Sequence, residues 1–133
     1  MARAHRAAIF FGSFTLLAMC FSPGAFAAAK PAITRVSATA RPEVFNGECP
    51  AALEFVGTIR VSKHPVTVEY VWERSNSSRS AVRRIQVRSA VQLITDEWSV
   101  GGPSGQMQVW EKLTILSPVN IASAKAMATV NCK

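Results

Sequence analysis

The amino-acid sequence predicts an all-β protein, an antiparallel sandwich of seven strands, on three observations. After the first 27 residues, short segments alternate apolar and polar side chains with the period of two that half-buried strands show. Turn-forming residues separate these segments. No segment has the apolar spacing of an amphipathic helix. Such a series of short strands is typical of a sandwich, and a barrel is the alternative architecture.

Residues 1–27 have the layout of a secretory signal peptide, which predicts a secreted or periplasmic protein. Two arginines precede an apolar run, and small residues follow it where signal peptides are cleaved: Arg3, Arg6, Ala7–Phe21, Ala25 and Ala27. Cleavage after Ala27 leaves residues 28–133. These 106 residues are the size of one domain with a single modest core.

Two alternatives to secretion concern the same segment. Its apolar run falls short of the ~20 residues that a membrane-spanning helix needs, and Pro23 and Gly24 interrupt it. Cys20 is a candidate for lipidation, but Met19 places a bulky side chain where lipoprotein signals usually have a small one. We therefore expect no stable transmembrane segment after processing.

Three strands are expected before residue 75. They are Ile33–Thr39, Leu53–Ser62 and Val66–Arg74. The first is rich in β-branched residues, whereas the second and third alternate apolar and polar positions. Asn46-Gly47 reverses the chain before the second strand, and Pro65, which has no N–H to give to a ladder, lies in the turn before the third. Trp72 on the third strand is expected in the core, as in other sandwich folds.

Four strands are expected after the polar loop 75–80. They are Val82–Val87, Val91–Val100, Met107–Leu116 and Ala124–Cys132. The strongest chain breaker, Gly101–Gly105, separates the second of them from the third. Either face of Val91–Val100 can be the buried one: Trp98 favours its own face, which would also draw Asp96 inward. Trp110 lies opposite the more apolar face of its strand, so we expect it to be the most exposed tryptophan.

Cys49 and Cys132 remain after processing, and an exported chain enters an oxidising compartment, so one disulfide is expected between them. A zinc site is not expected, because only one histidine, His64, accompanies the two cysteines. In a seven-strand immunoglobulin-like order the last strand runs antiparallel to the second, so the end of one meets the start of the other. The two cysteines occupy those places, which favours the sandwich over the barrel.

The processed chain has thirteen basic and eight acidic residues, a net charge of +5. This is not the dense basic stripe of a nucleic-acid binder, so no nucleic-acid partner is expected. Four arginines form the one concentrated charge feature: Arg79, Arg83, Arg84 and Arg88. Two interpretations are open. The arginines can form an anion-binding edge that meets acidic glycans or lipid head groups. They can also belong to a solvated edge strand whose charges prevent aggregation, and we favour this second interpretation because exposed edge strands need such protection.

No pattern of catalytic residues stands out. His64 lies in a turn without a nucleophile or an orienting carboxylate nearby in the sequence. Asp96 and Glu97 are adjacent on a strand and so point to opposite faces, which excludes them as a facing carboxylate pair. No Asp-rich loop is present that could bind calcium. We expect no enzymatic activity, no metal and no cofactor, and a small secreted hydrolase with an unrecognised site is the alternative.

Several short motifs together resemble a family of small secreted bacterial immunoglobulin-like domains: Cys49-Pro50-Ala51, Tyr70-x-Trp72-x-Arg74, Trp98-x-x-Gly101-Gly102-Pro103 and Ala126-x-Ala128-x-Val130-x-Cys132. The Tyr-x-Trp element is also similar to that of PKD-type domains. The pattern departs at Ser75-Asn76-Ser77, where such domains often have an Asp-Gly turn. The resemblance implies an immunoglobulin-like, extracytoplasmic domain without a common chemistry. We predict a binding or structural module whose partner is a protein or an anionic glycan or lipid surface.

Overall fold

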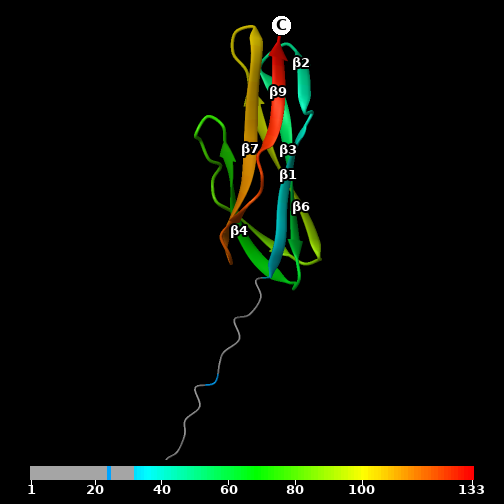
Figure 1. Cartoon of the computed structure of the whole chain (residues 1–133), viewed down its shortest axis with the longest axis vertical. Helices are drawn as coiled ribbons and strands as arrows, with labels where there is room; N and C mark the ends of the chain where they lie inside the picture. Colours follow the sequence, from blue (N-terminus) through cyan, green and yellow to red (C-terminus); the bar gives the residue numbers. More distant parts are fainter. Residues whose placement is uncertain (1–23, 25–31) are drawn as a thin grey trace, which may run out of the picture.

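The computed structural model describes Gly24 and residues 32–133 as two β-sheets packed face to face (Figure 1). The predicted signal segment, including Cys20, lies outside the described residues except for Gly24, as do residues 28–31 of the predicted domain. In the part that is described, no helix has the length and apolar character needed to cross a membrane. The all-β sandwich predicted from the alternation is confirmed.

All seven expected strands are present, those at 66–74 and 91–100 with the expected bounds and the other five with shifted bounds, but the described chain has nine strands rather than seven. The nine are β1 Ile33–Arg41, β2 Val44–Gly47, β3 Ala51–Val61, β4 Val66–Arg74, β5 Arg83–Val87, β6 Val91–Val100, β7 Gly105–Ser117, β8 Ile121–Ala122 and β9 Ala126–Cys132. The strands missed by sequence reasoning, β2 and β8, have four and two residues. Segments this short contain too few positions for an alternation to be recognised.

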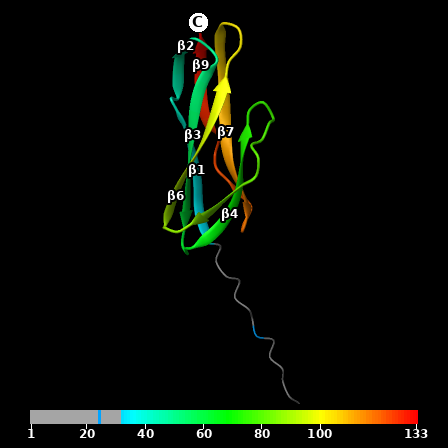
Figure 2. The same cartoon turned by 180° about the vertical axis from the view of Figure 1, so that it is seen from behind.

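The strand order places β1-β3-β6 in one sheet and β2-β9-β7-β4-β5 in the other, with β8 paired to β7. Figure 1 shows β9 between β2 and β7, and Figure 2 shows β3 and β6 from the opposite side. The expectation of a purely antiparallel sandwich was wrong in one place. The short strand β2 pairs with β9 in parallel, from Val44 opposite Thr129 to Gly47 opposite Cys132. The chain therefore changes sheets between β1 and β2.

The core lies between the two sheets, where the alternating faces of β3 and β4 meet. Phe55 and Ile59 of β3 and Trp72 of β4 are all fully buried, as the alternation predicts. Gly57 lies between these side chains, and a Cβ atom there would lie 2.7 Å from Leu113 and 3.0 Å from Trp72. A glycine is needed at this position because the side chains of the opposite sheet occupy the space of its missing methyl group.

The buried face of strand β6 is the one that carries Trp98. The sequence had left open which of the two faces of this strand is buried. Ile94, Asp96 and Val100 on that face are buried, whereas Leu93 on the other face is 59% exposed. Trp98 itself is partly buried and packs near Phe55. Asp96 is therefore buried within reach of the arginines of the polar cluster described below.

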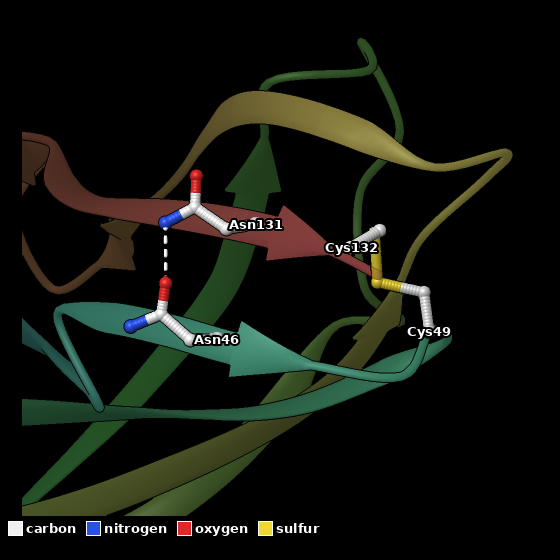
Figure 3. Close-up of a disulfide and its surroundings, with 4 residues drawn as sticks. All are labelled: Asn46, Cys49, Asn131 and Cys132. Atoms are coloured by element: carbon white, nitrogen blue, oxygen red, sulfur yellow. Dashed lines mark hydrogen bonds between the residues drawn. A yellow bond between two sulfur atoms is a disulfide. The ribbon is translucent and has the colours of Figure 1, made fainter.

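The predicted disulfide is confirmed: Cys49 and Cys132 are bonded, with their Cα atoms 5.4 Å apart (Figure 3). The parallel pairing of β2 with β9 explains the contact, since Gly47 lies opposite Cys132 and Cys49 follows two residues later. In Figure 3 the Asn131 side-chain amide donates a hydrogen bond of 2.8 Å to the side-chain oxygen of Asn46 on the same pair of strands. The bridge thus ties the end of β9 to the connection between β2 and β3.

Candidate functional site

The four arginines of the predicted anion-binding edge have different partners within the domain. Arg79, in the loop before β5, pairs with Glu73 at 2.8 Å, and Arg83 at the start of β5 pairs with the buried Asp96 at 2.8 Å. The other two have partners on different strands: Arg84 pairs with Glu69 on β4, and Arg88 donates to Gln86 on β5. Three of the four charges are therefore matched by carboxylates within the domain. A joint role in anion binding stays a prediction, and Arg79 lines one of the hollows described below.

Arg74 at the end of β4 is the centre of a polar cluster that joins the two sheets. Its Nε donates to Glu111 Oε1 on β7 at 2.7 Å, and its Nη2 donates to Asp96 Oδ2 on β6 at 2.8 Å. Arg83 donates to the second oxygen of Asp96 at 2.8 Å. The guanidinium of Arg74 also lies over the ring of Trp98, 5.5 Å from its centroid. Two cations and two carboxylates from four strands thus hold one another in place.

Glu111 is the least expected member of this cluster. It is fully buried, and its Oε2 atom has no hydrogen-bond partner within the described residues. Burial, together with the negative charge of Asp96, raises the pKa of Glu111 to about 7, against the hydrogen bond from Arg74 that lowers it. A protonated Glu111 leaves one negative charge, that of Asp96, between two arginines. The sequence did contain a signal, because Glu111 lies in phase with the apolar positions Val109 and Leu113.

Asp96 and Glu111 form a carboxylate pair, because both bind Arg74. This pair was not predicted from the sequence, where Asp96 was compared only with its neighbour Glu97. The side-chain exposures of Asp96 and Glu111 are 4% and 0%, and both carboxylates accept hydrogen bonds from arginine. A substrate would have to displace those arginines before it reached either oxygen. The geometry therefore favours a structural role for the pair.

We predict that the free energy of unfolding falls as pH rises from 5 to 8 because of Glu111. Its pKa in the folded chain, about 7, exceeds its ordinary value of 4.5. The stabilisation that comes from its protonation is therefore complete below pH 4.5 and is lost as pH rises through 7. The effect is on the order of 3 kcal/mol at 1.36 kcal/mol per pH unit.

Urea unfolding of the parent and of Glu111→Gln at pH 5 and pH 8 measures this effect. The neutral amide cannot lose a proton, so the variant should be nearly equally stable at the two pH values. Glu97→Gln, which alters an exposed carboxylate on the opposite face of β6, should keep the parent's pH dependence. An equal pH dependence in the parent and Glu111→Gln would show that Glu111 is already ionised at pH 5.

The loop between β4 and β5 separates two hollows on the surface. The first, which we call the Trp98 hollow, has a volume of about 370 Å³ and is lined by Ser75, Asn76, Trp98, Ser99, Val100, Gly101, Met107, Gln108 and Val109. The second, the Trp110 hollow, has about 260 Å³ and is lined by Glu73, Arg74, Ser75, Ser77, Ser78, Arg79, Trp110 and Lys112. Ser75 is common to both. Each hollow thus combines one tryptophan with polar side chains.

Local hydrogen bonds hold this loop in one conformation. The Ser75 amide donates to the carbonyl of Trp110 at 3.0 Å, and the Trp110 amide donates to the Ser75 hydroxyl at 3.3 Å. Asn76 accepts from the backbone amide of Ser78 at 3.0 Å. Ser77 has a φ of 66°, the left-handed region in which turns usually place glycine or asparagine. Serine and asparagine thus form this turn without a glycine.

The Trp110 hollow carries an excess of positive charge among the described residues. Glu73 pairs with both Arg79 at 2.8 Å and Lys112 at 3.1 Å. A hydrogen bond from Thr114 and the charge and hydrogen bond of Lys112 hold the pKa of Glu73 below its usual value, so it is ionised. Lys125 adds a third cation, with its Nζ atom 4.3 Å from the centroid of the Trp110 ring. Glu73 is therefore the one carboxylate among the described lining residues, and it contacts two cations, while Lys125 lies against the tryptophan.

His64 is exposed in the turn between β3 and β4, as expected from its position beside Pro65. Across residues 32–133, no three histidine, cysteine or acidic side chains gather in a way that could hold a metal ion. No protein-family model, curated protein or solved structure matches the chain. The candidate site is therefore defined by its own geometry, the two hollows that flank the β4–β5 loop.

Proposed function

We propose that this chain is a secreted or periplasmic binding module without catalytic activity, and that it binds an anionic glycan at the Trp110 hollow. The observation that carries the proposal is the composition of that hollow. It is lined by an aromatic ring, by serine hydroxyls and by the cations Arg74, Arg79 and Lys112 against one carboxylate, Glu73, and Lys125 lies against the Trp110 ring.

Each of these groups suits one part of an acidic sugar. An aromatic surface packs against the apolar C–H groups of a sugar ring, and serine hydroxyls can exchange hydrogen bonds with sugar hydroxyls. Arginine and lysine attract a carboxylate or sulfate group, and arginine can bind it through two parallel hydrogen bonds. The hollow is small, so we expect it to contact one sugar residue and to bind it weakly.

Two further observations support the extracytoplasmic, immunoglobulin-like part of the proposal. The Cys49–Cys132 disulfide is of the kind that persists in oxidising compartments. The seven longer strands divide as β1-β3-β6 and β9-β7-β4-β5, an order compatible with immunoglobulin-like sandwiches. The bacterial, PKD-like relationship suggested by the motifs remains part of this proposal.

Retention on an immobilised acidic polysaccharide tests the function. We expect the parent to be retained at low salt and released at moderate salt, because added ions screen exposed charges. The double variant Arg79→Gln/Lys112→Gln should lose retention at low salt while it keeps the parent's thermal stability within a few degrees. Arg84→Gln is the control, since it removes an exposed, ion-paired arginine that does not line the hollow.

Three results would argue against the proposal. Equal loss of retention in Arg84→Gln and in the double variant would mean that net charge, not the Trp110 hollow, governs binding. A parent that is not retained on any of a panel of acidic polysaccharides at low salt would rule out the anionic-glycan ligand. Retention on anionic lipid vesicles but not on polysaccharides would assign the surface to a membrane instead.

A further inference from the structure

The Trp98 hollow differs from the Trp110 hollow in its charge. Of the described residues that line it, none carries a formal charge. Asn76, Gln108 and Ser99 provide amide and hydroxyl groups, while Trp98 and Met107 provide apolar surface. The nearest cation, Arg74, lies over the Trp98 ring, and its guanidinium is already bound to Glu111 and Asp96. This hollow therefore suits an uncharged ligand that has both hydroxyl groups and an apolar face.

The two hollows are held in a fixed relation to each other. Ser75 lines both, and its amide and hydroxyl are hydrogen-bonded to the backbone of Trp110. Arg74 ends β4 directly before Ser75, and it connects Trp98 with the buried carboxylates of β6 and β7. Because these groups are ordered before a ligand arrives, a ligand that contacts both hollows loses little binding free energy to ordering the protein.

From this arrangement we propose that the Trp98 hollow is a second subsite, which takes an uncharged sugar residue next to the acidic residue bound in the Trp110 hollow. The ligand is then an oligosaccharide in which acidic and uncharged residues are neighbours. This inference rests on the proposed function, because it assigns the acidic residue to the Trp110 hollow. It adds the chain length and the composition that the ligand must have.

Hyaluronan fragments are suitable probes, because glucuronate and N-acetylglucosamine alternate in them. We expect the tetrasaccharide to bind at least tenfold more tightly than free glucuronate in titrations followed by NMR. Free glucuronate should shift the signals of Ser77 and Trp110, whereas the tetrasaccharide should also shift the Trp98 indole and the Gln108 side-chain amide. A galacturonate tetramer, in which every residue is acidic, should show a smaller gain in affinity over the single sugar.

Variants of each hollow separate the two parts of the inference. Gln108→Ala/Ser99→Ala removes polar groups of the Trp98 hollow only and should abolish most of the gain with chain length, while binding of free glucuronate stays unchanged. Arg79→Gln/Lys112→Gln should weaken binding of both probes. Gln86→Ala, which alters a side chain that lines neither hollow, is the control and should leave both affinities unchanged.

The outcomes distinguish this inference from the proposed function. If glucuronate and the tetrasaccharide bind equally well, or if the tetrasaccharide leaves the Trp98 and Gln108 signals unshifted, the second subsite is overturned while the Trp110 site stands. If neither sugar shifts any signal of the two hollows, the second subsite and the assignment of the acidic residue both fail. An equal gain with the all-acidic tetramer would overturn the preference for an uncharged neighbour.

Discussion

Replacement of Arg74 with leucine is expected to lower the free energy of unfolding by about 3–5 kcal/mol, the range for removing one partner of a buried ion pair. The Arg74 guanidinium binds Glu111 at 2.7 Å and Asp96 at 2.8 Å, and both carboxylates are almost completely buried. Without Arg74, Asp96 keeps only Arg83 and Glu111 keeps no cation among its described contacts. Since the cluster joins both sheets, its loss should also weaken their contact near Trp98.

Denaturant unfolding at pH 8 measures this effect, with Arg84→Leu as the control. Arg84 pairs with Glu69 on the exposed face, so its replacement should cost less than about 1 kcal/mol. The double variant Arg74→Met/Glu111→Leu should recover much of the lost stability, because apolar groups of similar volume can replace a buried ion pair. If Arg74→Leu is as mild as the control, the cluster is hydrated and contributes little.

Replacement of Trp72 with alanine is expected to destabilise the domain by about 3–5 kcal/mol, the range for losing a large buried aromatic side chain. Trp72 is fully buried between the sheets, close to Gly57 and opposite Leu113 in the pairing of β4 with β7. The cavity left by its indole cannot be refilled by Gly57, which has no side chain. A domain of this size has only about 5–15 kcal/mol of stability, so the variant should be marginally folded.

Trp72→Phe separates the contribution of aromatic packing to stability from the effect of the indole N–H group. The Trp72 Nε1 atom is buried without a hydrogen-bond partner among the described residues, so its removal deletes an unsatisfied donor. We expect Trp72→Phe to cost clearly less than Trp72→Ala in the midpoint of urea unfolding. An alanine variant that unfolds at the parent's midpoint would place the indole on the surface, in conflict with its burial.

The candidate site was predicted from the sequence only in part. Arg79 was singled out as a member of an arginine cluster. Trp98 was noted because it favours burial of its own strand face, and Trp110 because it was expected to be the most exposed tryptophan. The partners of the arginines could not be predicted. A strand alternates its side chains between faces, so the adjacent residues Arg83 and Arg84 pair with carboxylates on different strands, Asp96 and Glu69. The two hollows depend on the loop 75–78 and on its hydrogen bonds to β7, which no local pattern indicates.

By itself the sequence determined the all-β class, the positions of the longer strands, the burial of Trp72 and the pairing of Cys49 with Cys132. These features follow from local alternation, turn residues and the small number of cysteines, all of which can be recognised along a single chain. The tertiary structure alone decided the parallel pairing of β2 with β9 and the contact of Arg74 with Asp96 and Glu111. Such contacts depend on the register between strands that are 15 or more residues apart in the chain. That register is set by packing of the whole core, because a shift of one residue would turn every side chain of a strand to the other face.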